Sequence, residues 1–285
     1  MKPAPFIRHV PKTLAEALKI LNDVAPEDGR VLAGGQSLVP IMAFRMARPA
    51  HLVDINEVAG LDKLAVEAGK LVVGARVRHA AFHKSSAPGP LGTLLTAVAR
   101  NIAHYPIRMR GTMCGSLANA DPASEWCLTA ATLDGQMVAK SASGERVIPA
   151  REFFEGIMST ALAENELLAE VRLPLLPEGT RFGFNEFSRR AGDFAMSASL
   201  AVYELKDGKI VNPRVGVGGA EPHPRRITEA EQALAGQAPG DAVFRAAAEA
   251  AATAIDPLED AQTNADYRRD LVRAVVRRAL EASAK

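Results

Sequence analysis

The sequence predicts an α+β protein of two domains, and three observations support this prediction. Segments that alternate like strands are interspersed with segments whose apolar residues recur at helical spacing. After the linker LPLLPEGT at 173–180, which contains Pro174, Pro177 and Gly179, strands come first and helices follow. The composition, 48% hydrophobic and 24% charged over 285 residues, is that of a globular protein of one or two domains. We therefore expect a larger domain over 1–176 and a smaller one over 177–285.

The first predicted subdomain covers about 1–58. Residues 12–23 place Leu14, Ala17, Leu18 and Leu21 at helical spacing and predict an amphipathic helix. A short apolar strand then runs into AGGQS at 33–37, where two glycines indicate a tight turn. A helix beyond Pro40 and a short buried strand over 51–55 complete this unit.

The second subdomain, 59–176, begins with a predicted hairpin over 64–82 that turns at Gly69 and Lys70 and leads into a helix. Residues 91–104 predict a helix, and RGTMCGSLANADP at 110–122 predicts a glycine-rich loop. From Trp126 we expect a helix, a strand, a turn at Ser143 and Gly144, and a return strand. A strand over 167–173 closes the unit.

The smaller domain is predicted to hold a three-stranded antiparallel sheet within 181–219, with a turn at Asp207 and Gly208. From about Ile227 the pattern is Ala-rich and helical. Residues 264–282 suit one amphipathic helix packed against that sheet.

Charge and cysteine content exclude several classes of protein. Lys and Arg total 34 against 33 for Asp and Glu, a net charge of +1 that argues against nucleic acid or an anionic membrane as partner. No apolar stretch approaches the roughly 18–20 residues of a membrane span, and the amino terminus lacks a secretory signal, so we expect a cytoplasmic protein. Two cysteines, Cys114 and Cys127, are too few for a disulfide framework or a four-cysteine cluster, and the six histidines show no ligand spacing. We expect no metal site in this chain.

Two glycine-containing segments are candidates for binding an anion, AGGQS at 33–37 and GTMCGS at 111–116. Glycine lets the backbone approach a ligand closely and turn its N–H groups toward a pyrophosphate. Neither segment matches the dinucleotide fingerprint or the phosphate loop of nucleotide triphosphatases. Each taken alone is also compatible with an ordinary tight turn.

Their flanking residues make the pair specific. VLAGGQSLVPIM, followed by RGTMCGSLANADPASE, resembles the two FAD-contacting loops in the medium subunits of bacterial carbon monoxide dehydrogenase and related molybdenum hydroxylases. The segments at 186–205, 215–226 and 264–280 resemble the carboxy-terminal domain of the same subunits, so the resemblance covers nearly the whole chain. It implies a two-subdomain FAD-binding domain of the vanillyl-alcohol-oxidase (PCMH) type followed by a smaller α+β domain.

The resemblance also implies the residues that bind FAD. The first loop would wrap the diphosphate, the second would lie on its other side, and further positions would flank the ribose, the adenine and the isoalloxazine ring. The implied cofactor-binding residues are Leu32, Ala33, Gly34, Gly35, Gln36, Ser37, Leu38, Ile102, Ala103, Thr112, Gly115, Ser116, Asn119, Asp121, Ser124, Glu125, Leu168, Arg189 and Asp193, and Ser188 and Arg190 lie in the last of these segments.

Cys114 departs from the family, which usually has Gly-Gly at this point of the second loop. A positive φ at Cys114 would strain its Cβ, so the family conformation must be one that an L-residue tolerates. A catalytic cysteine is one interpretation, and an apolar filler beneath the loop is the one we prefer. Cys127 beside Trp126 is expected in the core.

Several other polar residues have two interpretations. His104 and Tyr105 either lie near the ring or have a capping or packing role at a helix end. Arg189 and Arg190 with Asp193 either tune the flavin or form a surface ion pair. The arginines of 264–280 are expected on a solvated or subunit-facing surface.

By the same resemblance, the chemistry is divided among several chains. A large molybdenum-cofactor subunit oxidises the substrate, and a small subunit with two [2Fe–2S] clusters relays single electrons. This subunit passes them through FAD to NAD, a quinone, oxygen or another acceptor. The resemblance implies two copies of each subunit and no catalytic acid or base in this chain. The substrate of the complex stays open among carbon monoxide, purines, N-heterocycles and aldehydes.

Two alternatives differ in class. A stand-alone flavin oxidase or dehydrogenase would need catalytic bases over the ring, and the short carboxy-terminal domain offers no such constellation. A scaffold subunit that has lost its flavin is favoured only by Cys114.

Overall fold

A three-stranded parallel sheet begins the chain. The computed structural model describes residues 2–261 and 263–284, and in it the strands are ordered β1-β3-β2. Helix α1 packs on this sheet with Ala17, Leu18, Leu21 and Val24 buried, and the Thr13 side chain caps it by accepting a hydrogen bond from the Glu16 amide. The helix expected over 12–23 is thereby confirmed. The elements of this part are β1 (Ile7–His9), α1 (Leu14–Val24), η1 (Ala25–Glu27), β2 (Gly29–Leu32), α2 (Leu38–Ala43), β3 (His51–Asp54) and η2 (Ile55–Glu57).

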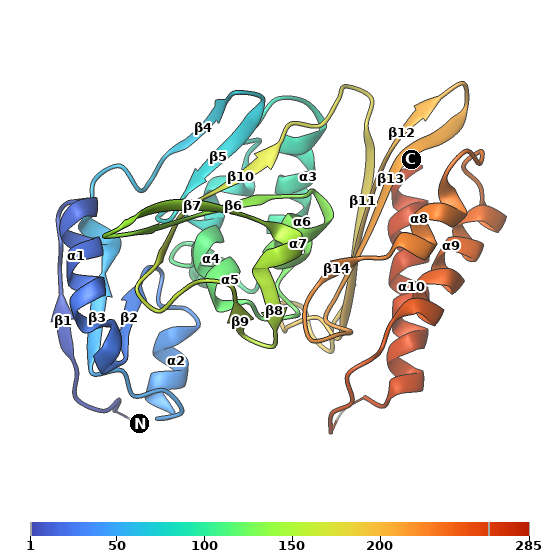
Figure 1. Ribbon diagram of the computed structural model, residues 1–285. Coiled ribbons are helices and arrows are strands. Elements are labelled where there is room, and N and C mark those ends of the chain that lie inside the picture. The colour runs from blue at the N-terminus through green and yellow to red at the C-terminus, as the bar shows by residue number, and fades with distance from the viewer. Residues whose placement is uncertain (1, 262, 285) are drawn as a thin grey trace.

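A five-stranded antiparallel sheet follows, in the order β4-β5-β10-β6-β7. Both predicted hairpins are present, and Gly69 and Gly144 at their turns have φ of +74° and +145°. The last strand of the unit, β10, lies between the two hairpins and joins them into one sheet (Figure 1). The strands are β4 (Leu64–Glu67), β5 (Lys70–Gly74), β6 (Gln136–Ser141), β7 (Gly144–Pro149) and β10 (Leu167–Pro174).

Short helices connect these hairpins, and one of them corrects the sequence prediction. The segment expected to be a glycine-rich loop forms helix α5 from Met113, because the Thr112 side chain caps its first turn by accepting from the Gly115 amide at 3.0 Å. Met113, Cys114 and Leu117 form its buried face. The connecting elements are η3 (His79–His83), α3 (Gly89–Ala99), α4 (Tyr105–Arg108), α5 (Met113–Asn119), α6 (Glu125–Thr132), α7 (Ala150–Phe153), β8 (Phe154–Gly156) and β9 (Ser159–Thr160).

The carboxy-terminal part has an antiparallel sheet covered by helices on one face (Figure 1). The three expected strands are present, but a fourth strand of two residues, β14, extends the sheet. It follows the Pro-containing stretch at 222–224, which gives no strand signal. The elements are β11 (Arg181–Phe187), β12 (Ser197–Lys206), β13 (Lys209–Gly218), β14 (Arg225–Arg226), α8 (Thr228–Leu234), α9 (Asp241–Ala254) and α10 (Ala265–Ser283).

Strand β12 contributes to two hydrophobic cores. Ala198, Leu200 and Val202 belong to the core of the first 176 residues, while Ala201 and Tyr203 belong to the core that includes α8, α9 and α10. Alternating side chains of a strand point to opposite faces, so one face of this sheet packs on the larger part and the other packs on the helices. The division at 176/177 stays a prediction, because the packing is continuous across it.

Candidate functional site

A cleft of about 730 Å³ opens where the first glycine loop faces helix α5 and the loop before it. It also reaches β2, the start of β10 and the segment after β9. This is within the range of roughly 300–1,000 Å³ that is typical of cofactor pockets. Of the predicted site residues, the cleft is lined by Leu32, Ala33, Gly34, Gly35, Gln36, Ser37, Leu38, Thr112, Gly115, Ser116, Asn119 and Leu168.

Glycine is required where the two walls of the cleft meet. A Cβ at Gly34 would stand 2.3 Å from the Arg110 carbonyl oxygen and 2.7 Å from the Gly111 Cα, both of them backbone atoms. A Cβ at Gly111 would stand 2.5 Å from Nε2 of His79. Gly35 has a φ of +72°, a conformation that side chains disfavour. These glycines let the first loop and the segment before α5 touch.

The remaining predicted site residues do not line this cleft. Ile102 and Ala103 lie in the turn between α3 and α4, where Ala103 has a φ of 41° and Arg108 donates to both carbonyl oxygens, at 2.7 and 2.8 Å. The next residue, His104, is the N-cap of α4, but its side chain makes no capping hydrogen bond. Its ring lies beside Gly192, in the loop that holds Ser188, Arg189, Arg190 and Asp193.

Asp121, Ser124 and Glu125 surround the start of α6. The Ser124 side chain accepts from the Cys127 amide at 3.4 Å and Asp121 accepts from the Ala123 amide at 2.9 Å. Burial, and then the nearby Asp121, raise the pKa of Glu125 to about 7. Burial, followed by Glu125, also raises the pKa of Glu186 on β11 to about 8. These carboxyl groups form an acidic cluster between the two parts of the chain.

Sequence reasoning missed the residues that complete the cleft. They come from the start of β2, from the end of α2 and the turn after it, from η3, and from the segment around β9. They include Asp28, Arg30, Met46, Arg48, His79, Met158, Thr160, Glu164 and Glu166. No local motif marks them, because each reaches the cleft through the packing of distant segments.

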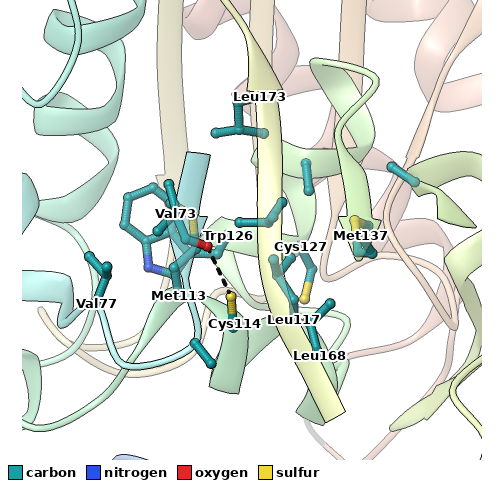
Figure 2. Packing of buried hydrophobic residues seen from close by; sticks show 14 of the residues in the cluster. Val73, Val77, Met113, Cys114, Leu117, Trp126, Cys127, Met137, Leu168 and Leu173 are labelled. Carbon is teal, nitrogen blue, oxygen red and sulfur yellow. Dashed lines mark hydrogen bonds between the residues drawn. The ribbon is translucent and has the colours of Figure 1, made fainter. Parts of the chain in front are cut away.

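Cys114 has the packing role that we preferred. It lies within α5, is absent from the residues with positive φ, and is 2% exposed. Its Sγ lies 3.5 Å from the Val73 carbonyl oxygen, as Figure 2 shows. Burial raises the pKa of this thiol well above its usual value, which leaves it protonated. Cys127 is fully buried in the same cluster, as expected (Figure 2).

The site can be tested for its fit to FAD on its own geometry. The cleft has the size for a dinucleotide, and its contact point is built from glycines without room for a Cβ. Arg48 also lines the wall, while Arg30 is paired with Asp28. Close approach of the backbone is what a bound diphosphate needs. The residues present therefore fit the group. Among the described residues, no three His, Cys, Asp or Glu side chains gather as a metal site, and no helix is long and apolar enough to cross a membrane.

Two family models match the chain in order. One, described as the FAD binding domain in molybdopterin dehydrogenase, covers residues 4–176, and the other, the CO dehydrogenase flavoprotein C-terminal domain, covers 182–283. The chain is 36% identical over 283 residues to the nicotine 6-hydroxylase medium subunit of Paenarthrobacter nicotinovorans, covering 99% of each chain. It is 33% identical to the carbon monoxide dehydrogenase medium chain of Hydrogenophaga pseudoflava, covering 99% of this chain and 98% of the other.

A solved structure shares the whole fold. The chain matches reconstituted CO dehydrogenase from Oligotropha carboxidovorans with a TM-score of 0.95 and 31% identity over 99% of both chains. The relatives are subunits of dehydrogenases and hydroxylases, which confirms the resemblance and the oxidoreductase class predicted from the sequence. The chain belongs to the FAD-binding medium subunits of the molybdenum hydroxylase family, the family of carbon monoxide and xanthine dehydrogenases.

Proposed function

We propose that this chain holds FAD in the cleft between the first glycine loop and α5, and that it passes electrons from [2Fe–2S] clusters of a partner subunit to an external acceptor. The observation that supports this most directly is the cleft itself, whose two walls meet at Gly34 and Gly111 with no space for a side chain. FAD, when bound, supplies a centre that accepts electrons singly and releases them in pairs.

The chain's own residues bind and orient the cofactor in this proposal. Main-chain N–H groups of the 33–38 loop would hold the diphosphate from one side, and Thr112, Gly115 and Ser116 would contact it from the other. Asn119 would lie toward the ribose and Leu168 toward the ring. His79 adds a neutral imidazole to the same wall, since burial, and then Arg108 and Arg78, lower its pKa to about 3.

We propose a different role for the predicted site residues that lie outside the cleft. Ile102, Ala103, Arg189 and Asp193 lie on the turn before α4 and on the loop packed against it. We propose that these two segments approach the exposed edge of the flavin, where electrons enter or leave. Asp121, Ser124 and Glu125 would act from the start of α6.

The partners are also part of the proposal. A large molybdenum-cofactor subunit and a small [2Fe–2S] subunit, two copies of each with two of this chain, follow from the resemblance. The chain matches relatives that are named as subunits over 99% of its length, which argues against a stand-alone oxidase. The cytoplasmic location expected from the sequence stays a prediction.

Purification of the tagged chain from the cells that naturally produce it tests this function. We expect flavin, iron and molybdenum to copurify with the chain in fixed proportion through size exclusion, measured by element analysis and by flavin release. Flavin without iron or molybdenum would indicate the stand-alone oxidase. A preparation that contains both metals but releases no flavin would indicate the flavin-free scaffold.

A further inference from the structure

A polar network behind the cleft joins its two walls. Asn56, on η2 just after β3, is its central residue. The Nδ2 of Asn56 donates to the Ala33 carbonyl oxygen at 2.8 Å, and its Oδ1 accepts from Nη2 of Arg78 at 2.5 Å. The first contact holds the 33–38 loop by its backbone.

Arg78 holds the opposite wall. Its Nη1 donates to the carbonyl oxygen of Arg110, and its backbone pairs with Thr112 in an isolated antiparallel bridge. The next residue, His79, donates its amide to the Gly111 carbonyl at 3.0 Å. The segment that precedes α5 is thus bound along three residues to the stretch around Arg78.

Asp54 fixes the orientation of the Asn56 amide. Its Oδ1 accepts from the backbone and side-chain nitrogens of Asn56 at 3.0 and 2.6 Å, and its Oδ2 accepts from Nη2 of Arg8 at 2.6 Å. Burial alone would raise the pKa of this carboxyl, yet the hydrogen bonds from Asn56 and Arg8 hold it below its usual value. A charged, buried acceptor leaves the Asn56 side chain one orientation, with Oδ1 toward Arg78.

We propose that Asn56 and Arg78 are positioning residues that set the distance between the two walls of the FAD cleft, a role that rests on the proposed function. Neither residue lines the cleft, so both act through the backbone of Ala33 and Arg110. Removal of either one frees a carbonyl group of one wall and leaves the other partner unsatisfied.

The charges around Arg78 support this assignment. Burial, then Arg110 and Arg76, lower its pKa, and Asp54 opposes them. Asp54, which orients the Asn56 amide, therefore also helps to keep Arg78 charged between the two walls.

A titration of flavin-free full chain with FAD, followed by flavin fluorescence, tests the proposal. Asn56→Ala and Arg78→Gln are each expected to raise the Kd about ten-fold. The double variant is expected to bind no more weakly than the weaker single variant, because the two residues act as a unit. Amide hydrogen exchange without FAD is expected to become faster at 34–36 and 111–113 in both variants.

Arg76→Gln is the matched control. Arg76 is half-buried, lies two residues away, and donates to the Val58 carbonyl oxygen at 2.5 Å, so it joins the same two stretches of chain without touching either wall. We expect this variant to lose thermal stability but to keep its Kd within about two-fold of wild type. If Arg78→Gln does not fold, Arg78→Lys replaces it with an intermediate Kd expected.

The outcomes separate the two claims. Folded Asn56→Ala and Arg78→Gln proteins with the Kd and loop exchange of wild type would overturn the positioning role while leaving the proposed function intact. A wild-type chain that binds no FAD would overturn the proposed function. In that case the exchange rates of the two walls still decide whether Asn56 and Arg78 position them.

Discussion

His79 accepts a hydrogen bond at Nδ1 from the indole Nε1 of Trp126, with 2.9 Å between the two nitrogens. Its ring is buried, and its pKa is lowered to about 3 by burial, then by Arg108 and Arg78. The imidazole is thus neutral, with its proton on Nε2, which faces Gly111 at the wall of the cleft. Trp126 on α6 therefore fixes the tautomer of His79, a side chain that lines the cleft.

Trp126→Phe should lower stability more than the lost aromatic area explains. The variant leaves Nδ1 of His79 buried without a donor, which costs about 1–3 kcal/mol of unfolding free energy. Urea denaturation followed by circular dichroism measures the loss. The pair Trp126→Phe and His79→Phe should cost less together than the sum of the two. Additive losses would show that the hydrogen bond contributes nothing to stability.

Gly34→Ala should abolish tight FAD binding. The new Cβ would stand 2.3 Å from the Arg110 carbonyl oxygen, so the two walls must move apart. Gly240→Ala is the control, because Gly240 has an extended φ of 178° and no atom within 4 Å of a Cβ. Isothermal titration with FAD measures both variants. Wild-type affinity in Gly34→Ala would mean that contact between the walls is not required.

Glu186→Gln should make the protein less sensitive to alkaline pH. Burial, and then Glu125, raise the pKa of Glu186 to about 8 from the ordinary 4.5, and its Oε2 has no partner among the described residues. A carboxyl whose pKa is higher in the folded state stabilises the fold below the unfolded value, and this stability is lost as pH rises through the folded value.

Urea unfolding of both proteins across this pH range measures the effect. The variant should match wild type near pH 4.5 and exceed it above about pH 8. Parallel curves for the two proteins would contradict the raised pKa of Glu186.

Neither cysteine should react with a thiol reagent in the folded protein. Burial, more than the neighbouring carboxylates, raises the pKa of Cys127 to about 12 and that of Cys114 further still. The reactive thiolate is therefore scarce and inaccessible. A colorimetric disulfide reagent should modify both thiols only after denaturant is added. Rapid labelling of Cys114 in the native protein would revive the interpretation of a reactive cysteine.

The sequence predicted those features that depend on local chemistry. The helix over 12–23 follows from the spacing of Leu14, Leu18 and Leu21, and the hairpins follow from Gly69 and Gly144 at their turns. The first glycine loop can be recognised in the sequence because the residues that form it follow one another along the chain. Helix α5 was missed because its glycine and polar residues obscure helical spacing, and only the Thr112 cap marks its start.

What the sequence could not predict depends on contacts between distant segments. Strand β10 lies between β5 and β6 because of pairing across the sheet, and nothing in residues 167–173 specifies those partners. His79 reaches the cleft only when η3 packs against Gly111. Twelve of the nineteen predicted site residues line one cleft, and the other seven lie outside it: Ile102, Ala103, Asp121, Ser124, Glu125, Arg189 and Asp193. Contact with FAD stays a prediction for all nineteen.

Titration of the purified chain with FAD, followed by the emission of Trp126, tests the central claim most directly. Trp126 is the only tryptophan of the chain, and it donates a hydrogen bond to His79 in the cleft wall. Flavins absorb where tryptophan emits, so bound FAD should quench this emission to a saturable plateau at about one FAD per chain. A colourless chain whose Trp126 emission does not change with added FAD would contradict the account.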